Sequence, residues 1–329
     1  MNKPAILVIG GAGYIGSHMV ADLLRTGYPV VTLDNLSKGH RELLPGGDFI
    51  EGDLGNTGDL GRVFSQYPVK AVMHFAAHSL VGESVEKPLA YYRNNVANTL
   101  TLLETMQQHR VPHFIFSSTA AVYGEPVETP ITEAHPCAPT NPYGATKLTV
   151  ERMLQDASHA SGLRYSCLRY FNAAGADASG ELGERHQPET HLVPLVLQVA
   201  TGERDAIQIF GNDYPTPDGT CLRDYVHVSD LTQAHLLALE TLLHGGGNSV
   251  YNLGNSTGYS VKQVIDTARE ITGHAIPAVP VERRTGDPAV LVADSSRIRS
   301  ELGWRPEYES LEAIIRSAWT WHQKEAAAT

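Results

Sequence analysis

The sequence has little cysteine and no long apolar run. Its three cysteines, Cys137, Cys167 and Cys221, show neither an obvious pairing nor metal-site spacing, so we expect buried, reduced thiols. No apolar stretch is long enough to span a membrane. The apolar start of the chain stops at glycines and lacks a cleavage-site pattern, which indicates a strand rather than a signal peptide. These absences favour a cytoplasmic protein with no membrane partner.

Positive charge is also scarce. The 25 lysines and arginines are outnumbered by 36 acidic residues, a formal net charge of -11, which argues against nucleic acid as a partner. An anionic small molecule would therefore need a local basic patch. The 15 histidines are scattered without an H-E-x-x-H motif, so we expect no metal site.

A tyrosine and a lysine stand four residues apart in the middle of the chain. Asn141 and Pro142 suit an N-cap and a first helical residue, so Tyr143 and Lys147 would lie one turn apart at a helix start. A phenol has a pKa of about 10. An ammonium about 4 Å away stabilises the phenolate by about 4 kcal/mol, or about three pKa units, while burial opposes this. Because such pairs also arise by chance, this one needs support from another site.

Support comes from a glycine turn near the N-terminus. The apolar run Ile6–Ile9 predicts a buried parallel strand, and Gly10, Gly13 and Gly16 follow it before an apolar-periodic helix. Glycines at this place let a pyrophosphate approach the backbone at the helix N-terminus. The spacing is G-x-x-G-x-x-G, and a plain tight turn is the alternative explanation.

The second apolar run ends at an acid. Asp34 follows Val30–Leu33 and can bind the adenosine ribose hydroxyls of a dinucleotide. Lys38 and Arg41 nearby could meet a 2′-phosphate instead. The position of the carboxylate at the strand end favours NAD.

Short apolar runs alternate with amphipathic stretches through the first half, including a helix expected at about 88–109. This pattern predicts a Rossmann-like, doubly wound parallel sheet followed by a smaller mixed α/β domain. A change in composition at 173–188 places the boundary between residues 1–173 and 174–329, with the segment near 224–243 packing back on the first domain.

Two strand ends carry polar residues with more than one explanation. Ser117, Ser118 and Thr119 follow an apolar strand and should face the nicotinamide and the substrate, although a plain turn would also use hydroxyl residues. Asp53 could bind the adenine or cap a helix that begins near Thr57.

These features together resemble the extended short-chain dehydrogenase/reductase family, and within it most closely the UDP-glucose 4-epimerases. The likeness covers essentially the whole chain. Beyond the glycine turn and Tyr143 with Lys147, it rests on these segments: Asp34-Asn35, Asp53-Leu54, His74 to Ala77, Val81 to Ser84, Ser117 to Gly124, Arg169 to Asn172, Phe210 to Tyr214, Arg223 to Val228 and Gly286 to Pro288.

The resemblance implies a role for each matching residue. Tyr143, Lys147 and Thr119 would be catalytic, with threonine standing where the family commonly has serine. Residues 1–173 would bind NAD, and residues 174–329 would bind a UDP-hexose. The implied NAD contacts are Gly10, Gly13, Tyr14, Ile15, Gly16, Asp34, Asn35, Asp53, Leu54, Phe75, Ala76, Ala77, Asn94, Ser117, Tyr143, Lys147 and Tyr170.

The implied substrate contacts include Arg223 and Arg284, whose planar guanidinium groups suit a diphosphate. Without the resemblance, each arginine would be interpreted as a surface charge. The family often has asparagine where His191 stands. The resemblance implies that Leu291 limits the size of the sugar, although Leu291 could instead be simply a core strand residue. The full set is Thr119, Tyr143, Phe171, Asn172, His191, Leu192, Gln208, Phe210, Arg223, Tyr225, Arg284, Asp287 and Leu291.

The residues after Thr119 separate the related reactions. Sugar-nucleotide dehydratases carry a carboxylate pair there, whereas this chain has Ala120 and Ala121, which cannot move protons. We therefore expect epimerisation of UDP-glucose and UDP-galactose at carbon 4, through a keto intermediate that turns over. A non-catalytic dinucleotide sensor and a simple dehydrogenase remain alternatives. The family also implies a homodimer, formed by the helices after Pro88 and Pro142.

Overall fold

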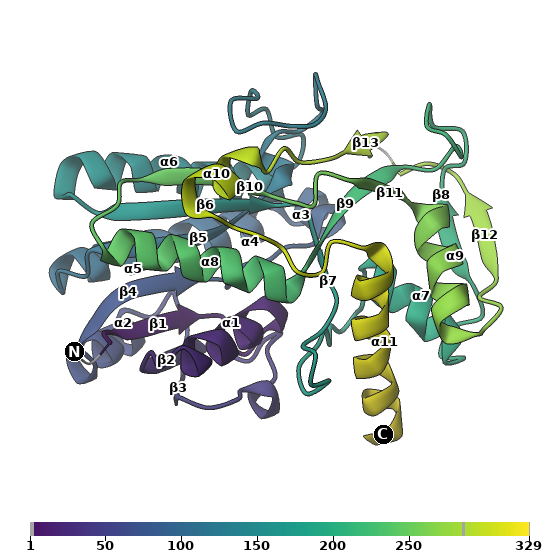
Figure 1. The fold of residues 1–329 in the computed structure, drawn as a ribbon. Coiled ribbons are helices and arrows are strands. Elements are labelled where there is room, and N and C mark those ends of the chain that lie inside the picture. The colour runs from purple at the N-terminus through teal and green to yellow at the C-terminus, as the bar shows by residue number, and fades with distance from the viewer. Residues whose placement is uncertain (1–2, 285–286, 329) are drawn as a thin grey trace. The chain divides into compact units, whose positions relative to one another are not determined.

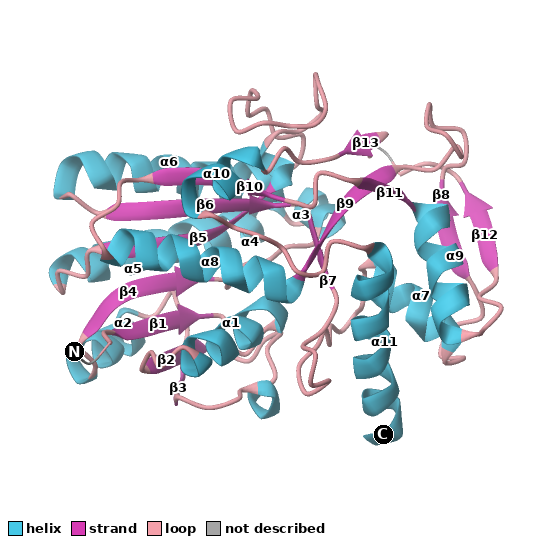
Figure 2. Cartoon of the chain, in the orientation of Figure 1, coloured by secondary structure: helices cyan, strands magenta, loops and turns pink. Residues whose placement is uncertain are grey.

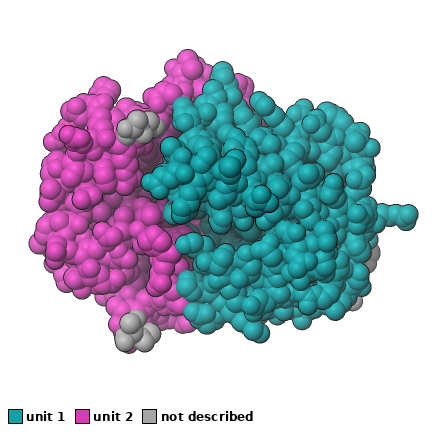
Figure 3. All heavy atoms as spheres, turned by 180° about the vertical axis from the view of Figure 1, so that it is seen from behind, with its two compact units in different colours: residues 1–124, 136–169, 232–251 teal, residues 125–135, 170–231, 252–329 magenta. Residues whose placement is uncertain are grey.

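The computed structural model describes residues 3–284 and 287–328, so Gly286 lies outside the described residues. The chain forms two compact units, each discontinuous in sequence (Figure 3). Unit 1 contains residues 1–124, 136–169 and 232–251, and unit 2 contains residues 125–135, 170–231 and 252–329. Within the described ranges, no helix combines the length and apolarity needed to cross a membrane.

A seven-stranded sheet organises unit 1, with strand order β10-β6-β5-β4-β1-β2-β3 (Figure 1). β1 pairs in parallel with both β2 and β4, so the direction of winding reverses beside it. This is the doubly wound order that the sequence predicts, with one added strand. The strands are β1 (Ala5–Ile9), β2 (Val30–Asp34), β3 (Asp48–Glu51), β4 (Val69–His74), β5 (His113–Thr119), β6 (Arg164–Tyr170) and β10 (Ser249–Leu253).

Helices follow most of these strands, and one core packs the side chains of β1, β4 and β5 against α2, α5 and α6. The helix expected at about 88–109 is confirmed as one helical run, interrupted by a six-residue π-helical segment. The elements are α1 (Tyr14–Arg25), η1 (Arg41–Leu43), α2 (Thr57–Gln66), α3 (Val81–Glu86), α4 (Pro88–Tyr91), η2 (Tyr92–Ala97), α5 (Asn98–Gln108), η3 (Ala120–Val122) and α6 (Pro142–Ser161).

The start of α6 follows the sequence prediction. The Asn141 side chain accepts a hydrogen bond from the Gly144 N–H at 2.9 Å, and Pro142 is the first helical residue. The helix ends at Gly162, whose φ of 75° is the left-handed conformation that glycine tolerates. Local signals at both ends thus fix the helix that carries Tyr143 and Lys147.

In unit 2, β9 (Leu222–His227) is the central strand. It pairs in parallel with β7 (Asn172–Ala174) and β13 (Val290–Leu291), and antiparallel with β11 (Gly258–Ser260). A separate parallel pair joins β8 (Ile207–Phe210) to β12 (Ala278–Val281). The helices, labelled in Figure 2, are α7 (Leu192–Ala200), α9 (Val261–Thr272), α10 (Ser296–Leu302) and α11 (Leu311–Ala328), and α8 (Val228–Leu243) runs from unit 2 into unit 1.

Long-range contacts explain why the units are interleaved rather than divided at one point near residue 173. In unit 1, the Thr232 hydroxyl of α8 donates to Asp22 of α1 at 2.5 Å. The Ser166 and Ser249 hydroxyls, on β6 and β10, are hydrogen-bonded at 2.9 Å. In unit 2, the Ile131 N–H donates to the carbonyl of Val292 at 2.8 Å. These pairings join residues far apart in sequence, which composition alone does not reveal.

Candidate active site

The end of β5 and the first turn of α6 bring a hydroxyl to a phenol. Thr119, the last residue of β5, is hydrogen-bonded to the Tyr143 side chain. The Thr119 Oγ1 also accepts from the Ala121 N–H at 3.2 Å. Burial raises the pKa of Tyr143 to about 12, and the bond to Thr119 acts in the opposite direction. The phenol is therefore held in place, but its proton is held tightly in the protein alone.

Lys147 lies one turn further along α6 and is buried. Its Nζ donates to the carbonyl of Ser117 at 2.8 Å and lies 4.8 Å from the centre of the Phe116 ring and 6.0 Å from that of Tyr143. Burial lowers the pKa of Lys147 to about 7, whereas Glu151 acts to raise it. The charge of this ammonium thus changes near neutral pH.

A buried ionic network lies beside Lys147. Glu151 Oε1 accepts from the Ser118 hydroxyl at 2.5 Å and from Arg169 Nε at 2.9 Å, and Glu151 Oε2 accepts from Arg169 Nη2 at 2.5 Å. Arg169 also donates to the Tyr123 hydroxyl at 2.9 Å. The expectation that Ser118 faces the cofactor and substrate was wrong, because its hydroxyl is committed to this network. Glu151 follows Lys147 by four residues, and this spacing could have indicated from the sequence that the two side chains lie on one face of the helix.

The glycine turn brings backbone into close contact. A Cβ on Gly10, where φ is 76°, would lie 2.6 Å from the Ala76 nitrogen, and a Cβ on Gly16 would lie 2.1 Å from the Gly10 oxygen. Among the described residues, no side chain caps the N-terminus of α1, which follows Gly13. A helix start of this kind binds phosphate through its N–H groups.

Three polar residues lie at or just beyond the ends of β2 and β3. The Asp34 carboxylate accepts from the Ala12 N–H at 3.0 Å, which ties β2 to the glycine turn, and burial raises the pKa of Asp34. Asn35 Nδ2 donates to Asp53 Oδ2 at 2.8 Å. The N-cap of α2 is Asn56, so the alternative explanation of Asp53 as that cap was wrong.

The chain after β4 returns to the glycine turn. The N–H groups of Phe75 and Ala76 donate to the Ile9 carbonyl at 2.8 and 3.2 Å. The other expected cofactor residues of unit 1 lie near the strand ends or helix starts: Tyr14 and Ile15 in the first turn of α1, Leu54 after β3, Ala77 after β4, and Ser117 near the end of β5. Tyr170, the last residue of β6, belongs to unit 2.

Two adjacent asparagines in the π-helical segment have different environments. Asn95 is buried, accepts from the His78 N–H at 2.9 Å and donates to the Thr146 hydroxyl at 3.1 Å. Asn94, the residue that the sequence singled out, is partly exposed and donates to Asn95 Oδ1 at 3.0 Å. π-Helical turns often occur at functional sites. The sequence missed Asn95, because nothing local distinguishes it from its neighbour.

Within unit 2, the β9 sheet gathers several expected substrate residues. Asn172 on β7 pairs with Tyr225, and Leu291 on β13 pairs with Arg223. Arg223 Nη2 forms an ion pair with Asp287 Oδ1 at 2.5 Å. Two further expected substrate residues contact each other, since the Arg284 guanidinium is 3.8 Å from the centre of the ring of Phe210, the last residue of β8. Gln208 is on the same strand, and Phe171 precedes β7.

A buried carboxylate that the sequence did not identify holds this sheet together. Asp224 accepts from the N–H groups of Asn255, Ser256 and Ala293 at 2.7, 3.1 and 3.0 Å. Burial raises the pKa of Asp224 to about 7, although these three bonds oppose the shift. These bonds hold the backbone of β9 in place at Asp224, the residue that follows Arg223.

His191 and Leu192 stand at the start of α7, where the sequence expected substrate contacts. His191 Nδ1 contacts Glu184 Oε1, and His186 and Glu189 lie beside them. The sequence predicts no metal site, yet the structure gathers two imidazoles and two carboxylates here. The spacing H-x-x-E-x-H was present in the sequence.

Comparisons with known proteins agree with this geometry. The family described as "NAD dependent epimerase/dehydratase family" matches residues 6–254. The chain is 54% identical over 320 residues to a UDP-glucose 4-epimerase of Halalkalibacterium halodurans, covering 97% of this chain and 96% of the relative.

Two solved structures extend the comparison. The Bifidobacterium longum UDP-glucose 4-epimerase in complex with NAD+ and UDP has a TM-score of 0.93 and 40% identity, covering 99% of this chain and 100% of that one. The UDP-Glc/GlcNAc 4-epimerase of Campylobacter jejuni has a TM-score of 0.86 and 43% identity, covering 98% and 99%.

Proposed function

Because the chain belongs to the NAD dependent epimerase/dehydratase family, we propose that it interconverts UDP-glucose and UDP-galactose by inverting carbon 4 of the sugar. The observation that carries this proposal is the group at the end of β5: Thr119 bonded to Tyr143, with Lys147 one turn away. This set can hold a sugar hydroxyl and accept its proton. The family relatives give it its substrate class.

The residues of unit 1 suit NAD. The glycine turn leaves no room for a Cβ at Gly10 or Gly16, and the uncapped start of α1 suits a pyrophosphate. Asp34, at the end of β2, would bind the adenosine ribose, and Lys147 the nicotinamide ribose. Bound NAD would supply a reversible hydride acceptor and a positive charge near the phenol.

Tyr143 would act as the base that takes the proton of the hydroxyl group on carbon 4 and later returns it to the same oxygen. In the protein alone its pKa is about 12, so it needs nearby positive charge to form a phenolate at neutral pH. The Lys147 ammonium supplies part of that charge. Thr119 would position the reacting oxygen and donate to the phenolate. Ala120 and Ala121 offer no proton carrier for a dehydration, which favours epimerisation.

Unit 2 would hold the UDP-sugar. Arg223 and Arg284 would bind the diphosphate, since guanidinium forks match phosphate oxygens. Asn172, Tyr225 and Asp287 would support that group from the β9 sheet. Phe171, His191, Leu192, Gln208 and Phe210 would complete the nucleotide site, and Leu291 would limit the sugar size.

The enzyme would work as a homodimer. Five apolar side chains on α3, the 88–97 helical segment and α5 are exposed, which is costly in water and typical of a partner surface. They are Val81, Val85, Leu89, Tyr92 and Leu100, exposed by 46%, 62%, 81%, 41% and 48%. A second copy of the same surface would cover them. A cytoplasmic location fits the three free cysteines.

An assay of the purified protein without added NAD tests the activity. We expect UDP-galactose to yield UDP-glucose with no net reduction of NAD, and heat denaturation to release NAD into the supernatant. A dependence on stoichiometric soluble NAD would identify a simple dehydrogenase instead. A 4-keto-6-deoxy product would identify a dehydratase.

A further inference from the structure

Residues 175–191, which connect β7 to α7, form a long segment without helix or strand (Figure 2). Loops of this length are uncommon in compact domains unless something orders them. Glu184, His186, Glu189 and His191 lie in the second half of this loop. Each offers one ligand atom, and these atoms all lie within 4.8 Å of one another.

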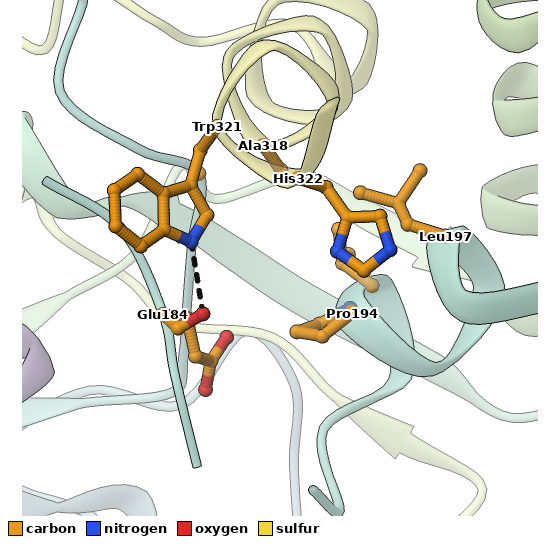
Figure 4. Close-up of a pocket in the computed structure, with 8 residues that line it drawn as sticks. Glu184, Pro194, Leu197, Ala318, Trp321 and His322 are labelled. Atoms are coloured by element: carbon orange, nitrogen blue, oxygen red, sulfur yellow. Dashed lines mark hydrogen bonds between the residues drawn. The ribbon is translucent and has the colours of Figure 1, made fainter. Parts of the chain in front are cut away.

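The C-terminal helix holds the backbone at Glu184. Trp321 of α11 donates its indole N–H to the Glu184 carbonyl at 3.0 Å (Figure 4). A Cβ on Gly183 would lie 2.2 Å from the Trp321 ring, so this contact needs glycine. The residue after Glu184 is held as well, because Arg185 donates to both carboxylate oxygens of Glu325 at 2.5 and 2.6 Å. The Glu184 side chain therefore projects from a fixed backbone.

The Glu184 carboxylate has little access to water, since only 5% of its side chain is exposed. A cavity of about 20 Å³ is lined by Glu184 together with Pro194, Leu197, Ala318 and His322. That is room for about one water molecule. A buried carboxylate in such a place needs a cation or several donors.

The remaining groups converge on Glu184. His186 Nδ1 lies 2.9 Å from Glu184 Oε1, and His191 Nδ1 contacts the same oxygen. Glu189 Oε1 accepts from the N–H groups of Thr190 and His191 at 2.6 and 2.9 Å. This leaves Glu189 Oε2 directed at His186 Nδ1, 3.9 Å away. The backbone bonds thus orient the second carboxylate.

Two carboxylates meet two imidazoles, so the group has a net charge of -2 when both rings are neutral. Both carboxylates are largely buried, since only 5% of each side chain is exposed. A divalent cation would balance their two negative charges.

We propose that Glu184, His186, Glu189 and His191 bind one Zn²⁺ ion that ties the 175–191 loop in place. Two nitrogens and two oxygens are a donor set that zinc accepts, whereas calcium and magnesium prefer oxygen alone. Tetrahedral zinc at about 2.0–2.2 Å from each ligand separates its ligand atoms by about 3.3 Å. The separations of 2.9 and 3.9 Å at His186 lie on either side of that value.

Four protein ligands leave no open position, so the ion has a structural role. Because zinc binds only neutral imidazole, its affinity for the site should fall at acid pH. The proposal does not depend on the enzyme's substrate.

The test is a zinc titration of chelator-treated full-length protein, followed by calorimetry at pH 7. We expect one Zn²⁺ bound per chain and no comparable binding of Mg²⁺. His186→Ala and His191→Asn should abolish the stoichiometric site. Both side chains are partly exposed, at 30% and 50%, so both variants should fold. His274→Ala removes an exposed histidine of the same unit and should bind zinc like the wild type.

Thermal unfolding gives an independent readout. Zinc should raise the melting temperature of the wild type and of His274→Ala, but not of the two cluster variants. Absence of a stoichiometric zinc ion in the wild type would overturn the proposal and leave an ion-pair cluster without a metal. One equivalent retained by His186→Ala would also overturn it, because the ion would then lie elsewhere, such as at a cysteine.

Discussion

Lys147 Nζ donates to the carbonyl of Ser117 at 2.8 Å, and this bond joins helix α6 to the end of β5. Thr119 is two residues further along the same strand and is bonded to Tyr143 on the same helix. The strand end and the helix start are therefore linked twice. The phenol, the ammonium and the hydroxyl form one rigid group, which a tyrosine and a lysine with this spacing do not by themselves provide.

Replacement of Tyr143 by phenylalanine removes the phenolic oxygen and leaves the ring. We expect Tyr143→Phe to fold, to retain NAD and to lose about a hundred- to ten-thousand-fold in kcat, the usual contribution of a general base. Tyr28→Phe, at a buried tyrosine remote in sequence from β5 and α6, is the control and should keep its activity. Turnover near the wild-type value in Tyr143→Phe would exclude this residue as the base.

Glu151→Gln removes the negative charge that raises the pKa of Lys147. The Lys147 ammonium has a pKa of about 7, so it is lost as pH rises through that value. Without Glu151 its loss should begin at lower pH, and the alkaline limb of the kcat profile should move toward acid. Glu104→Gln, on the exposed face of α5, should leave the profile unchanged.

The Glu151 variant also breaks a buried ion pair with Arg169, which costs about 3–5 kcal/mol of folding free energy. Thermal unfolding must therefore show that it is folded under the assay conditions. A folded Glu151→Gln enzyme with the wild-type pH profile would show that Glu151 does not tune Lys147.

Leu89 is the most exposed of the five apolar side chains proposed for the dimer surface, at 81%. A glutamate there would bury a charge in the proposed interface, so Leu89→Glu should be a monomer by light scattering. Val279→Glu alters an apolar residue of β12 that is 50% exposed and should remain a dimer. Equal masses for the wild type and Leu89→Glu would place the interface elsewhere.

Leu291 is smaller than tyrosine and larger than alanine, so we expect some turnover of UDP-N-acetylglucosamine beside the main substrates. Leu291→Tyr should lower the N-acetyl activity by more than about tenfold, because a 2-acetamido group needs the space that the ring would fill. Activity on UDP-galactose should persist. Leu291→Met conserves the volume and serves as the control. If both activities of Leu291→Tyr fall together, or neither changes, Leu291 does not set the limit.

Local signals made much of unit 1 predictable. Asn141 and Pro142 marked the start of α6, and the alternation of apolar runs predicted the doubly wound parallel sheet. Each of these features depends on residues close together in sequence, where propensity and periodicity act.

Features that depend on distant partners were not predictable in the same way. Ser118 turns to Glu151 because Arg169 brings that carboxylate to the strand end. Asp224 binds N–H groups 31 to 69 residues away. The Glu184 cluster needs Trp321 to fix one of its ligands. In each case a polar residue that nothing in its local sequence distinguishes acquires its role from tertiary packing.

Epimerisation by transient oxidation requires that the hydride leave carbon 4 of the sugar and return to the same atom. This can be followed with UDP-galactose carrying deuterium at carbon 4, in ordinary water and without added NAD. We predict that UDP-glucose forms with the deuterium retained at carbon 4. Loss of the label to solvent, or its accumulation in reduced cofactor in step with product, would exclude this route.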